Sequence, residues 1–301
     1  MLLEMGMKSL NNIARQCRVV RPHVGAVTNV GEAHVGSLGN LDAIVRAKQE
    51  LIDGMRSGGT LFLNTDCPRS RRLSTKHFKG TTKTFGITHP ANVKGVNVRY
   101  STGGMKFDAY IEGKKYSFFT PVWGFHNVYN ALAAIGLARA VGCSIAQIQK
   151  GLSRVRPPKM RFQVIRSKSG RTLINDAWNA NPSAMKAGLT VLHNMSGKRP
   201  AIAVLGDMLE LGKYSQWAHQ SVGKHIAKLQ LSQLVTFGPK AREIAKTAMA
   251  NGMDSKRIFH FTSRSALIRH LKNSSNQALI YFKASRKLHF EKIIRELLHL
   301  R

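Results

Sequence analysis

The sequence predicts an α/β protein with two domains, the second built on a doubly wound parallel sheet. Beyond residue 160, short apolar runs alternate with helical patterns, which is typical of parallel strands covered by helices. Polar clusters follow several of these runs directly, at the place where such sheets bind ligands. The 301 residues are enough for two domains of ordinary size.

The first half of the chain predicts strands of two kinds around two helices. Apolar runs with small residues indicate buried strands, and short alternating pieces such as VNVRY favour small antiparallel strands. The predicted elements are a strand at 24–30, a glycine-rich loop at 31–40, a helix at 41–55, a turn and strand at 58–66, antiparallel strands within 67–120, and a helix at 124–142.

The chain opens on MLLEMGM, a short apolar run with one carboxylate inside it. Runs of this kind usually form buried strands, so Leu2–Met7 predicts an interior strand at the very start. Most chains begin with a frayed polar segment instead.

The segment RVRPPKMRF, residues 154–162, is the best candidate for a linker, because its two prolines break any continuing helix. It predicts domains at 1–156 and 157–301. In the second domain Asn181 is placed to cap a helix whose first residue is Pro182. The predicted strands are 171–177, 199–208, 233–238, 257–261 and 278–283, and the helices are 181–195, 215–229, 240–252, 265–273 and 290–300.

Composition excludes several classes of protein. With 43% hydrophobic residues the chain is not disordered, and no apolar stretch approaches the roughly 18 residues of a membrane span. The first residues lack the order of a signal peptide. The three cysteines show no metal or C-x-x-C spacing, which indicates reduced thiols. We therefore expect a cytoplasmic protein, with a plastid or other organelle as the alternative.

The formal charge of +32, from 47 Lys and Arg against 15 acids, is the outlier of the composition. Such a field attracts nucleic acid, nucleotides and anionic membranes. The basic residues are spread over the whole length, and there is no RNP-like aromatic string or zinc-finger spacing. A biased composition therefore remains the first interpretation, and we expect nucleic acid to bind only non-specifically.

Three polar segments follow predicted strands and hold the candidate site residues. TNVGEAH places His34 in a glycine-flanked loop, with Lys48 in the next helix. NDAWNANP and LGDMLELG place acids and amides at two further strand ends. Taken alone, each has an ordinary interpretation as a loop histidine, an Asn-rich turn or an acidic helix N-terminus.

In this order, these segments resemble the ATP-dependent Mur ligases of peptidoglycan synthesis. The resemblance extends from LLEMGM, through VVRPHVGAVTNVGEAHVGSLGN, IVRAKQEL, GFHNVYNALAAIGLA, NDAWNANPSAMKAGL and VLGDMLELG, to FKASRKLHFEKI. It implies part of a central ATP-binding domain followed by a Rossmann-like domain. It also implies an enzyme that joins D-alanyl-D-alanine to UDP-N-acetylmuramoyl-tripeptide with ATP and Mg²⁺, through an acyl phosphate.

The resemblance also implies residue roles. Glu4 and His34 would be magnesium ligands, and Lys48 would match a lysine that some members carbamylate into a further ligand; His34 and Lys48 would be the catalytic residues. Asn127 and Asn130 match residues near the adenine, while Arg161 and Asp176 match groups that reach the nucleotide from the C-terminal domain. The cleft between the domains and the dipeptide side would be lined by Asn179, Asn181, Asp207, Glu210, Lys283 and Ser285.

The chain departs from the family pattern in several places. It contains no phosphate-binding G-x-x-G-K-[ST] loop, which in the family precedes the segment that LLEMGM resembles. We therefore expect a truncation just before residue 1, with that loop and the UDP-sugar domain supplied upstream or by a separate fragment. Trp178 replaces a tyrosine, and Met160 and Ala284 replace glycines. The alternatives are a non-catalytic binding module on this fold and a basic nucleic-acid-binding protein.

Overall fold

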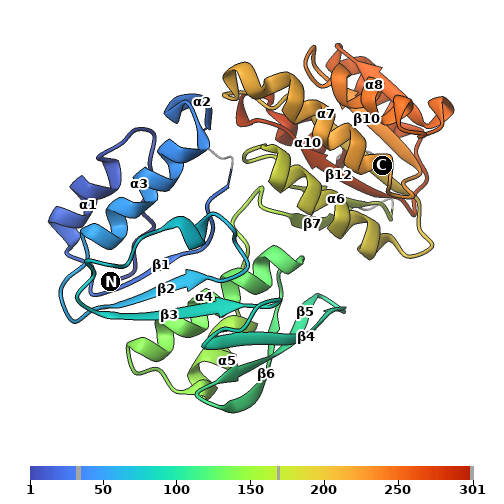
Figure 1. Cartoon of the computed structure of the whole chain (residues 1–301). Coiled ribbons are helices and arrows are strands. Elements are labelled where there is room, and N and C mark those ends of the chain that lie inside the picture. The colour runs from blue at the N-terminus through green and yellow to red at the C-terminus, as the bar shows by residue number, and fades with distance from the viewer. Residues whose placement is uncertain (32–34, 168–169, 299–301) are drawn as a thin grey trace. The chain divides into compact units, whose positions relative to one another are not determined.

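The computed structural model describes residues 1–31, 35–167 and 170–298, which form two compact units. The first unit is Met1–Arg156 and the second is Pro157–Arg301 (Figure 1). Each has its own sheet and its own core. Within the described ranges, no helix has the length and apolar character needed to cross a bilayer.

The first unit is built on a six-stranded mixed sheet in the order β1-β2-β3-β4-β5-β6. Neighbours from β1 to β4 run parallel, and β4, β5 and β6 are antiparallel. Its strands are β1 (Val24–Val27), β2 (Thr60–Asn64), β3 (Thr81–Gly86), β4 (Val93–Ser101), β5 (Gly104–Ile111) and β6 (Lys114–Thr120).

The prediction of antiparallel strands within 67–120 is confirmed for β4 to β6 and wrong for β3. That strand is parallel to both of its neighbours. The residues between β2 and β3 form a connection long enough to return to the same end of the sheet, as a parallel pair requires. A basic, threonine-rich sequence does not reveal that direction.

Five helices accompany the sheet in the described part of the first unit. The helix α4 lies against the sheet so closely that a Cβ on Gly136 would come within 2.6 Å of the Phe62 ring. The N-terminus of α5, which the sequence did not predict, has a capping box between Ser144 and Gln147. The helices are α1 (Asn12–Val20), α2 (Val35–Leu38), α3 (Leu41–Asp53), α4 (Phe125–Ala140) and α5 (Ile145–Ser153).

Residues 2–7 do not form the predicted strand. They have no regular secondary structure, and the Leu2 side chain is 87% exposed. A strand exists only where a neighbour completes its hydrogen bonds, and in the described ranges β1 pairs with β2 alone. Instead, Gly6 accepts a hydrogen bond from Gln16, and Met5 contacts Cys17 through sulfur. The segment therefore packs on α1 as irregular chain.

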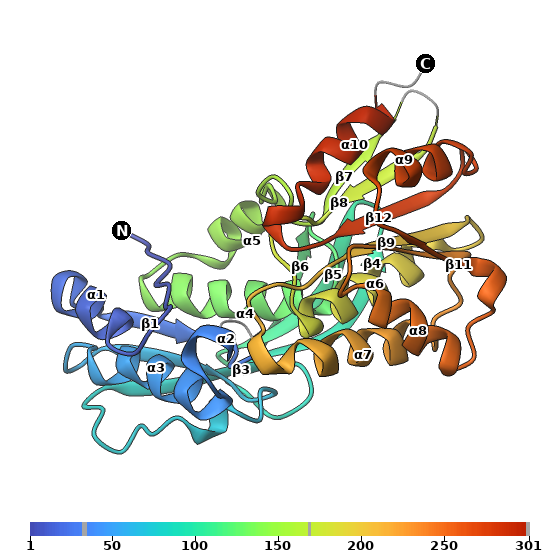
Figure 2. The same cartoon turned by 90° about the horizontal axis from the view of Figure 1, so that it is seen from above.

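The second unit has the predicted doubly wound architecture (Figure 2). Its sheet order is β11-β10-β9-β12-β8-β7, parallel except for the edge strand β7. The helices α6, α7 and α8 pack beside one another, and α9 packs on α10. The elements are β7 (Gln163–Arg166), β8 (Thr172–Asn175), α6 (Pro182–Ser196), β9 (Ala201–Gly206), α7 (Ser215–Ile226), β10 (Gln233–Phe237), α8 (Arg242–Ala250), β11 (Ile258–Phe261), α9 (Arg264–Lys272), β12 (Leu279–Lys283) and α10 (Phe290–Leu298).

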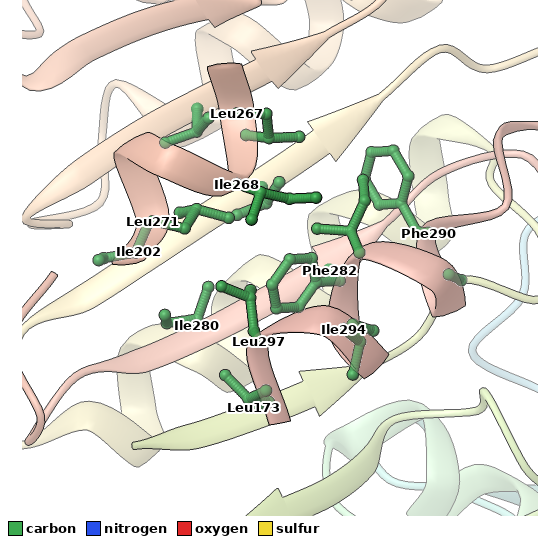
Figure 3. Packing of buried hydrophobic residues seen from close by; sticks show 14 of the residues in the cluster. Leu173, Ile202, Leu267, Ile268, Leu271, Ile280, Phe282, Phe290, Ile294 and Leu297 are labelled. Carbon is green, nitrogen blue, oxygen red and sulfur yellow. The ribbon is translucent and has the colours of Figure 1, made fainter. Parts of the chain in front are cut away.

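The core between the sheet and α9 and α10 explains one departure from the family pattern (Figure 3). Ala284 is fully buried in this core, and a Cβ built on Gly206 would lie 2.7 Å from the Ala284 methyl group. The methyl group thus points into apolar packing rather than towards solvent. Its burial favours folding by roughly 0.8 kcal/mol, because each buried apolar carbon contributes about that amount.

Candidate functional site

Three polar residues of the second unit lie at the carboxyl ends of adjacent strands, as the sequence predicted. Asp176 follows β8, Lys283 ends β12 and Asp207 follows β9, and in the sheet β12 lies between β8 and β9. Carboxyl ends of parallel strands meet at one edge. The topology thus brings together residues that are separated by up to 107 positions in the chain.

An ion pair between Lys283 and Asp176 is at the centre of this edge. The Lys283 Nζ donates to Asp176 Oδ2 at 2.6 Å, and the side chains are only 4% and 13% exposed. The Tyr281 hydroxyl donates to the same oxygen at 2.8 Å, and the Phe162 N–H donates to Oδ1 at 3.1 Å. Both carboxylate oxygens therefore have partners, as a buried charge requires.

Burial shifts the pKa values of the two titratable donors in this network, Lys283 and Tyr281. It lowers the pKa of the Lys283 ammonium, and the carboxylate of Asp176 opposes that shift by favouring the charged form. Burial, together with the Asp176 charge, raises the pKa of the Tyr281 hydroxyl well above its usual value. The hydroxyl therefore stays protonated and continues to donate to Asp176.

A turn at residues 160–162 is joined to this network and presents Arg161 to solvent. Met160 and Phe162, which flank Arg161, both have positive φ, +62° and +49°. The Met160 carbonyl accepts a hydrogen bond from the Trp178 N–H at 3.2 Å. The Arg161 guanidinium lies 6.0 Å from the centre of the Trp178 ring, at the limit of a cation–π contact. An exposed cation is therefore placed at the rim of the buried ion pair.

The LGDMLELG segment forms a loop that is fixed by internal hydrogen bonds. Asp207 is buried and accepts from the Ala241 N–H at 2.7 Å, while its carbonyl accepts from the Ser285 N–H. The Ser285 Oγ in turn accepts from the Leu209 N–H at 2.8 Å. Asp207 and Ser285 therefore shape the loop. Glu210, by contrast, is exposed and has a φ of +64°, a conformation that strains an L-residue.

His219 of α7 hydrogen-bonds the backbone of the same loop. Its Nδ1 lies 2.7 Å from the Ser215 carbonyl and its Nε2 lies 3.1 Å from the Met208 N–H. These partners require a proton on Nδ1 and a lone pair on Nε2, which is one neutral tautomer. Burial lowers the pKa of His219 and keeps it in this form.

Asn179 and Asn181 of NDAWNANP accept hydrogen bonds from neighbouring backbone N–H groups through their side-chain oxygens. Asn181 Oδ1 accepts from the Ala184 N–H at 2.8 Å and caps α6, so the predicted cap is confirmed. Asn179 is exposed, and its Oδ1 accepts from the Ala180 N–H. Both residues thus lie on the loop that starts with Asp176.

In the first unit, Asp66 joins the ends of β2 and β3 to α4. Its carboxylate accepts hydrogen bonds from the backbone N–H groups of residues 87, 88 and 89 and from the Tyr129 hydroxyl at 2.8 Å. These donors hold the pKa of Asp66 far below its usual value against the opposing effect of burial. Burial and the bond to Asp66 raise the pKa of Tyr129 to about 12. The N-terminal half of α4 is thereby anchored to the sheet.

Asn127 and Asn130, the predicted adenine-side residues, lie on this anchored part of α4. Asn127 Nδ2 donates to the Trp123 carbonyl at 2.7 Å, and Asn130 Nδ2 is 3.2 Å from Asn127 Oδ1. The Trp123 ring stacks on Tyr100 with centroids 6.2 Å apart. The amides are therefore held in one orientation beside a pair of aromatic rings.

Of the three predicted metal-side residues, the structure describes Glu4 and Lys48. Lys48 of α3 is half-buried, and burial lowers its pKa while Cys67 and Glu4 act in the opposite direction. Glu4 is exposed. His34 lies outside the described residues. Within the described ranges, no three His, Cys, Asp or Glu side chains gather as a metal centre.

Sequence reasoning missed four residues that organise these sites: Tyr281, Asp66, Tyr129 and His219. Asp66 is the last residue of the predicted strand at 58–66, and that position was an available signal. The other three lie inside an apolar strand or a helix, where a tyrosine or histidine carries no distinguishing pattern.

The comparisons with known proteins cover almost the whole chain. Residues 1–138 match the Mur ligase middle domain, and residues 160–286 match the domain described as "Mur ligase, glutamate ligase domain". The chain is 35% identical over 298 residues to the UDP-N-acetylmuramoyl-tripeptide–D-alanyl-D-alanine ligase of Bacillus subtilis (strain 168). That alignment covers 99% of this chain and 64% of the relative, so the chain spans a little under two thirds of its length.

Solved structures give the same result. The chain matches MurF from Acinetobacter baumannii with a TM-score of 0.88 at 27% identity, covering 99% of this chain and 64% of that one. It matches the MurF ligase from Thermotoga maritima in complex with ADP with a TM-score of 0.85, covering 98% of this chain and 66% of that one. At 23% identity the second match shows the fold alone.

Proposed function

The chain belongs to the Mur ligase family, and on that premise we propose that it carries part of a ligase that joins D-alanyl-D-alanine to UDP-N-acetylmuramoyl-tripeptide at the expense of ATP. The observation that supports this most is the 35% identity to a ligase of that name over 99% of the chain. We propose a cytoplasmic location, where ATP and nucleotide-linked precursors are available.

The proposed reaction has two steps. A carboxylate oxygen of the tripeptide attacks the γ-phosphorus of ATP, which forms an acyl phosphate and releases ADP. The amine of D-alanyl-D-alanine then attacks the acyl carbon, phosphate leaves with the C–O bonding pair, and the amine loses a proton. Both steps place negative charge on phosphoryl oxygens, so positioned cations and hydrogen-bond donors accelerate them.

In the second unit, Arg161 would contact phosphoryl oxygens directly, because its guanidinium is exposed and held by the 160–162 turn. Lys283 is buried and paired with Asp176, so it would not contact the substrates. It would hold the Asp176 carboxylate in place, and that carboxylate holds the turn that carries Arg161. Asn179, Asn181 and Glu210 lie on loops at the same edge and would meet the dipeptide. Asp207 and Ser285 would hold the loop that carries Glu210.

In the first unit, Asn127 and Asn130 would hydrogen-bond the adenine beside the Tyr100–Trp123 pair. Magnesium prefers oxygen ligands and commonly takes one or two carboxylates together with substrate phosphates. Glu4 offers one such oxygen near Lys48, which fits that pattern, whereas the Cys67 thiol does not. Magnesium would neutralise phosphate charge, Glu4 and His34 would hold it, and a carbamylated Lys48 would add oxygen ligands.

The sequence of 301 residues contains no G-x-x-G-K-[ST] phosphate loop. We therefore propose that a segment other than residues 1–301 supplies it. The proposed activity then requires that segment, because phosphate clamps contribute several kcal/mol of transition-state stabilisation.

The test mixes the purified chain with Mg-ATP and both substrates, with and without a polypeptide that carries the phosphate loop of the B. subtilis relative. We expect ADP release that requires both substrates and the added polypeptide, and that falls at least tenfold in an Asn127→Ala, Asn130→Ala variant. A matched Asn251→Ala variant, changed at the exposed residue directly after α8, should keep full activity. If the folded chain neither binds ADP nor supports its release in the complemented mixture, the ligase proposal is wrong.

A further inference from the structure

The ligase proposal leaves the +32 charge unexplained, and one segment of the first unit concentrates it. Residues 67–79, CPRSRRLSTKHFK, contain three arginines, two lysines and a histidine but no acid. This segment connects β2 to β3 and is not part of any site described above except through Cys67.

The segment and the helix α3 enclose a groove of about 700 Å³. Arg46 and Gln49 line it from α3, while Arg72, His77, Phe78 and Lys79 line it from the connecting segment. Ser57, which precedes β2, and Lys79, which precedes β3, both border it, so the groove lies at the amino ends of these strands. Asp66 marks the opposite, carboxyl end of β2. The groove is thus separate from the nucleotide-side residues of this unit.

The groove carries an excess of positive charge. In the described part of the chain, neither Arg46 nor Lys79 has a carboxylate partner, and Arg72 pairs only with the exposed Asp42 at 2.8 Å. An exposed pair of this kind opens at little cost, about 0–1 kcal/mol. The lining carboxylate, Asp53, already accepts a hydrogen bond from Gln49.

The walls of the groove are held together before any ligand binds. Gln49 bridges them, because its Oε1 accepts from the Ser74 N–H at 2.8 Å and its Nε2 donates to the Ser74 carbonyl at 2.9 Å. At the other end, the Lys79 carbonyl accepts hydrogen bonds from the Gly58 N–H and the Ser57 hydroxyl. A preformed site avoids the entropy cost of ordering a loop on binding.

We propose that this groove binds single-stranded nucleic acid. Its cations lie on both walls of a concave surface, which suits a phosphodiester strand better than the flat surface of an anionic membrane. The His77 and Phe78 rings line the same groove, and aromatic rings beside cations provide stacking surfaces for unpaired bases. Phosphate contacts of this kind are independent of base sequence. The Gln49 amide and the Asp53 carboxylate, which also line the groove, are already hydrogen-bonded within its walls.

The test measures binding of the full chain to a fluorescent oligouridylate and an oligothymidylate of about 12 nucleotides, a length within the usual site size for single strands. The groove variant is Arg46→Gln, Arg72→Gln, Lys79→Gln. We expect its affinity to fall at least tenfold, and the slope of log K against log salt to decrease by about 2, since each phosphate contact contributes about 0.7 on single strands.

The matched control is Lys106→Gln, Lys114→Gln, Lys115→Gln, which removes the same charge from exposed residues of β5 and β6 in the same unit. It should retain binding within about twofold. Vesicles that contain phosphatidylserine serve as the alternative polyanion. Equal losses in both variants would show diffuse attraction by net charge, and tighter binding to vesicles than to either oligonucleotide would show a membrane surface. Either result would overturn the proposal.

Discussion

The Lys283 ammonium donates to Asp176 Oδ2 at 2.6 Å, and the two side chains are only 4% and 13% exposed. This buried ion pair joins β12 to the loop after β8, and Asp176 also holds the backbone of the Arg161 turn through Phe162. A single carboxylate thus links a buried cation to an exposed one at the carboxyl edge of the sheet.

Replacing Asp176 with alanine should destabilise the second unit by about 3–5 kcal/mol, because it leaves the Lys283 charge buried without a partner. The double variant Asp176→Ala, Lys283→Met should recover part of this loss, since it removes the unpaired charge. Urea unfolding of each variant measures the free energy. Asp42→Ala, which breaks the exposed pair with Arg72, is the control and should cost less than about 1 kcal/mol. Equal effects of the two alanine variants would contradict the ion pair's role.

The Met160→Gly variant should be more stable than the Met160→Ala variant, by roughly 0.5–1 kcal/mol in unfolding free energy. Both variants remove the Met160 side chain, but only glycine adopts the φ of +62° without strain, a cost of about 1–2 kcal/mol for other residues. The larger entropy that glycine loses on folding, roughly 0.5–1 kcal/mol relative to alanine, offsets part of this gain. The difference between their unfolding free energies measures the backbone term. At Ala134, an exposed position inside α4, the order should reverse, because glycine there costs about 1 kcal/mol. The same order at both positions would contradict the strained turn.

Acid should destabilise the second unit partly through His219. Its folded pKa is lowered by burial, so between that value and the unfolded value of 6.5 the unfolded chain binds more protons. The contribution of neutral His219 to the free energy of unfolding is therefore fully present above about pH 6.5, and it is lost as the pH falls through the folded pKa. Unfolding free energies at several pH values should show a shallower decline in His219→Gln than in the parent. His225, His260 and His270 have pKa values lowered in the same direction and should account for the remaining decline.

Tyr129→Phe should destabilise the first unit by about 1 kcal/mol, because it removes one hydrogen bond from the Asp66 carboxylate. Besides Tyr281, whose pKa is raised well above its usual value, the ultraviolet titration of the parent should include one tyrosine that ionises only near pH 12, and this component should disappear in the variant. Tyr116→Phe is the control, since no hydrogen bond of its hydroxyl is seen in the described residues. A full set of ordinary tyrosine titrations in the parent would contradict the Asp66–Tyr129 bond.

Much of the fold follows from local pattern. The second unit alternates apolar strands with capped helices, and its predicted doubly wound sheet is confirmed. The strand predicted at Leu2–Met7 is wrong, because an apolar run does not specify whether a neighbouring strand will pair with it. The direction of β3 could not be predicted either, since it depends on the path of the connection rather than on the residues of the strand.

The sequence predicts which candidate site residues lie at the ends of strands, but not which of them contact one another. Asp176, Asp207 and Lys283 each follow or end an apolar run, so their common edge was accessible from the sequence. Their pairing was not, because it depends on β12 lying between β8 and β9. Tyr281 lies in a strand whose residues are all buried, so the sequence gives no sign that its hydroxyl hydrogen-bonds the carboxylate of the ion pair.

Isotope transfer tests the proposed participation of this chain in amide formation through an acyl phosphate. UDP-N-acetylmuramoyl-tripeptide labelled with ¹⁸O in its terminal carboxylate is incubated with ATP, Mg²⁺, D-alanyl-D-alanine, the chain and the loop-bearing polypeptide. Mass spectrometry should find one labelled oxygen in each inorganic phosphate formed, because the carboxylate oxygen leaves with the phosphoryl group. Phosphate that carries no label, with all ¹⁸O retained in the peptide, would contradict the account.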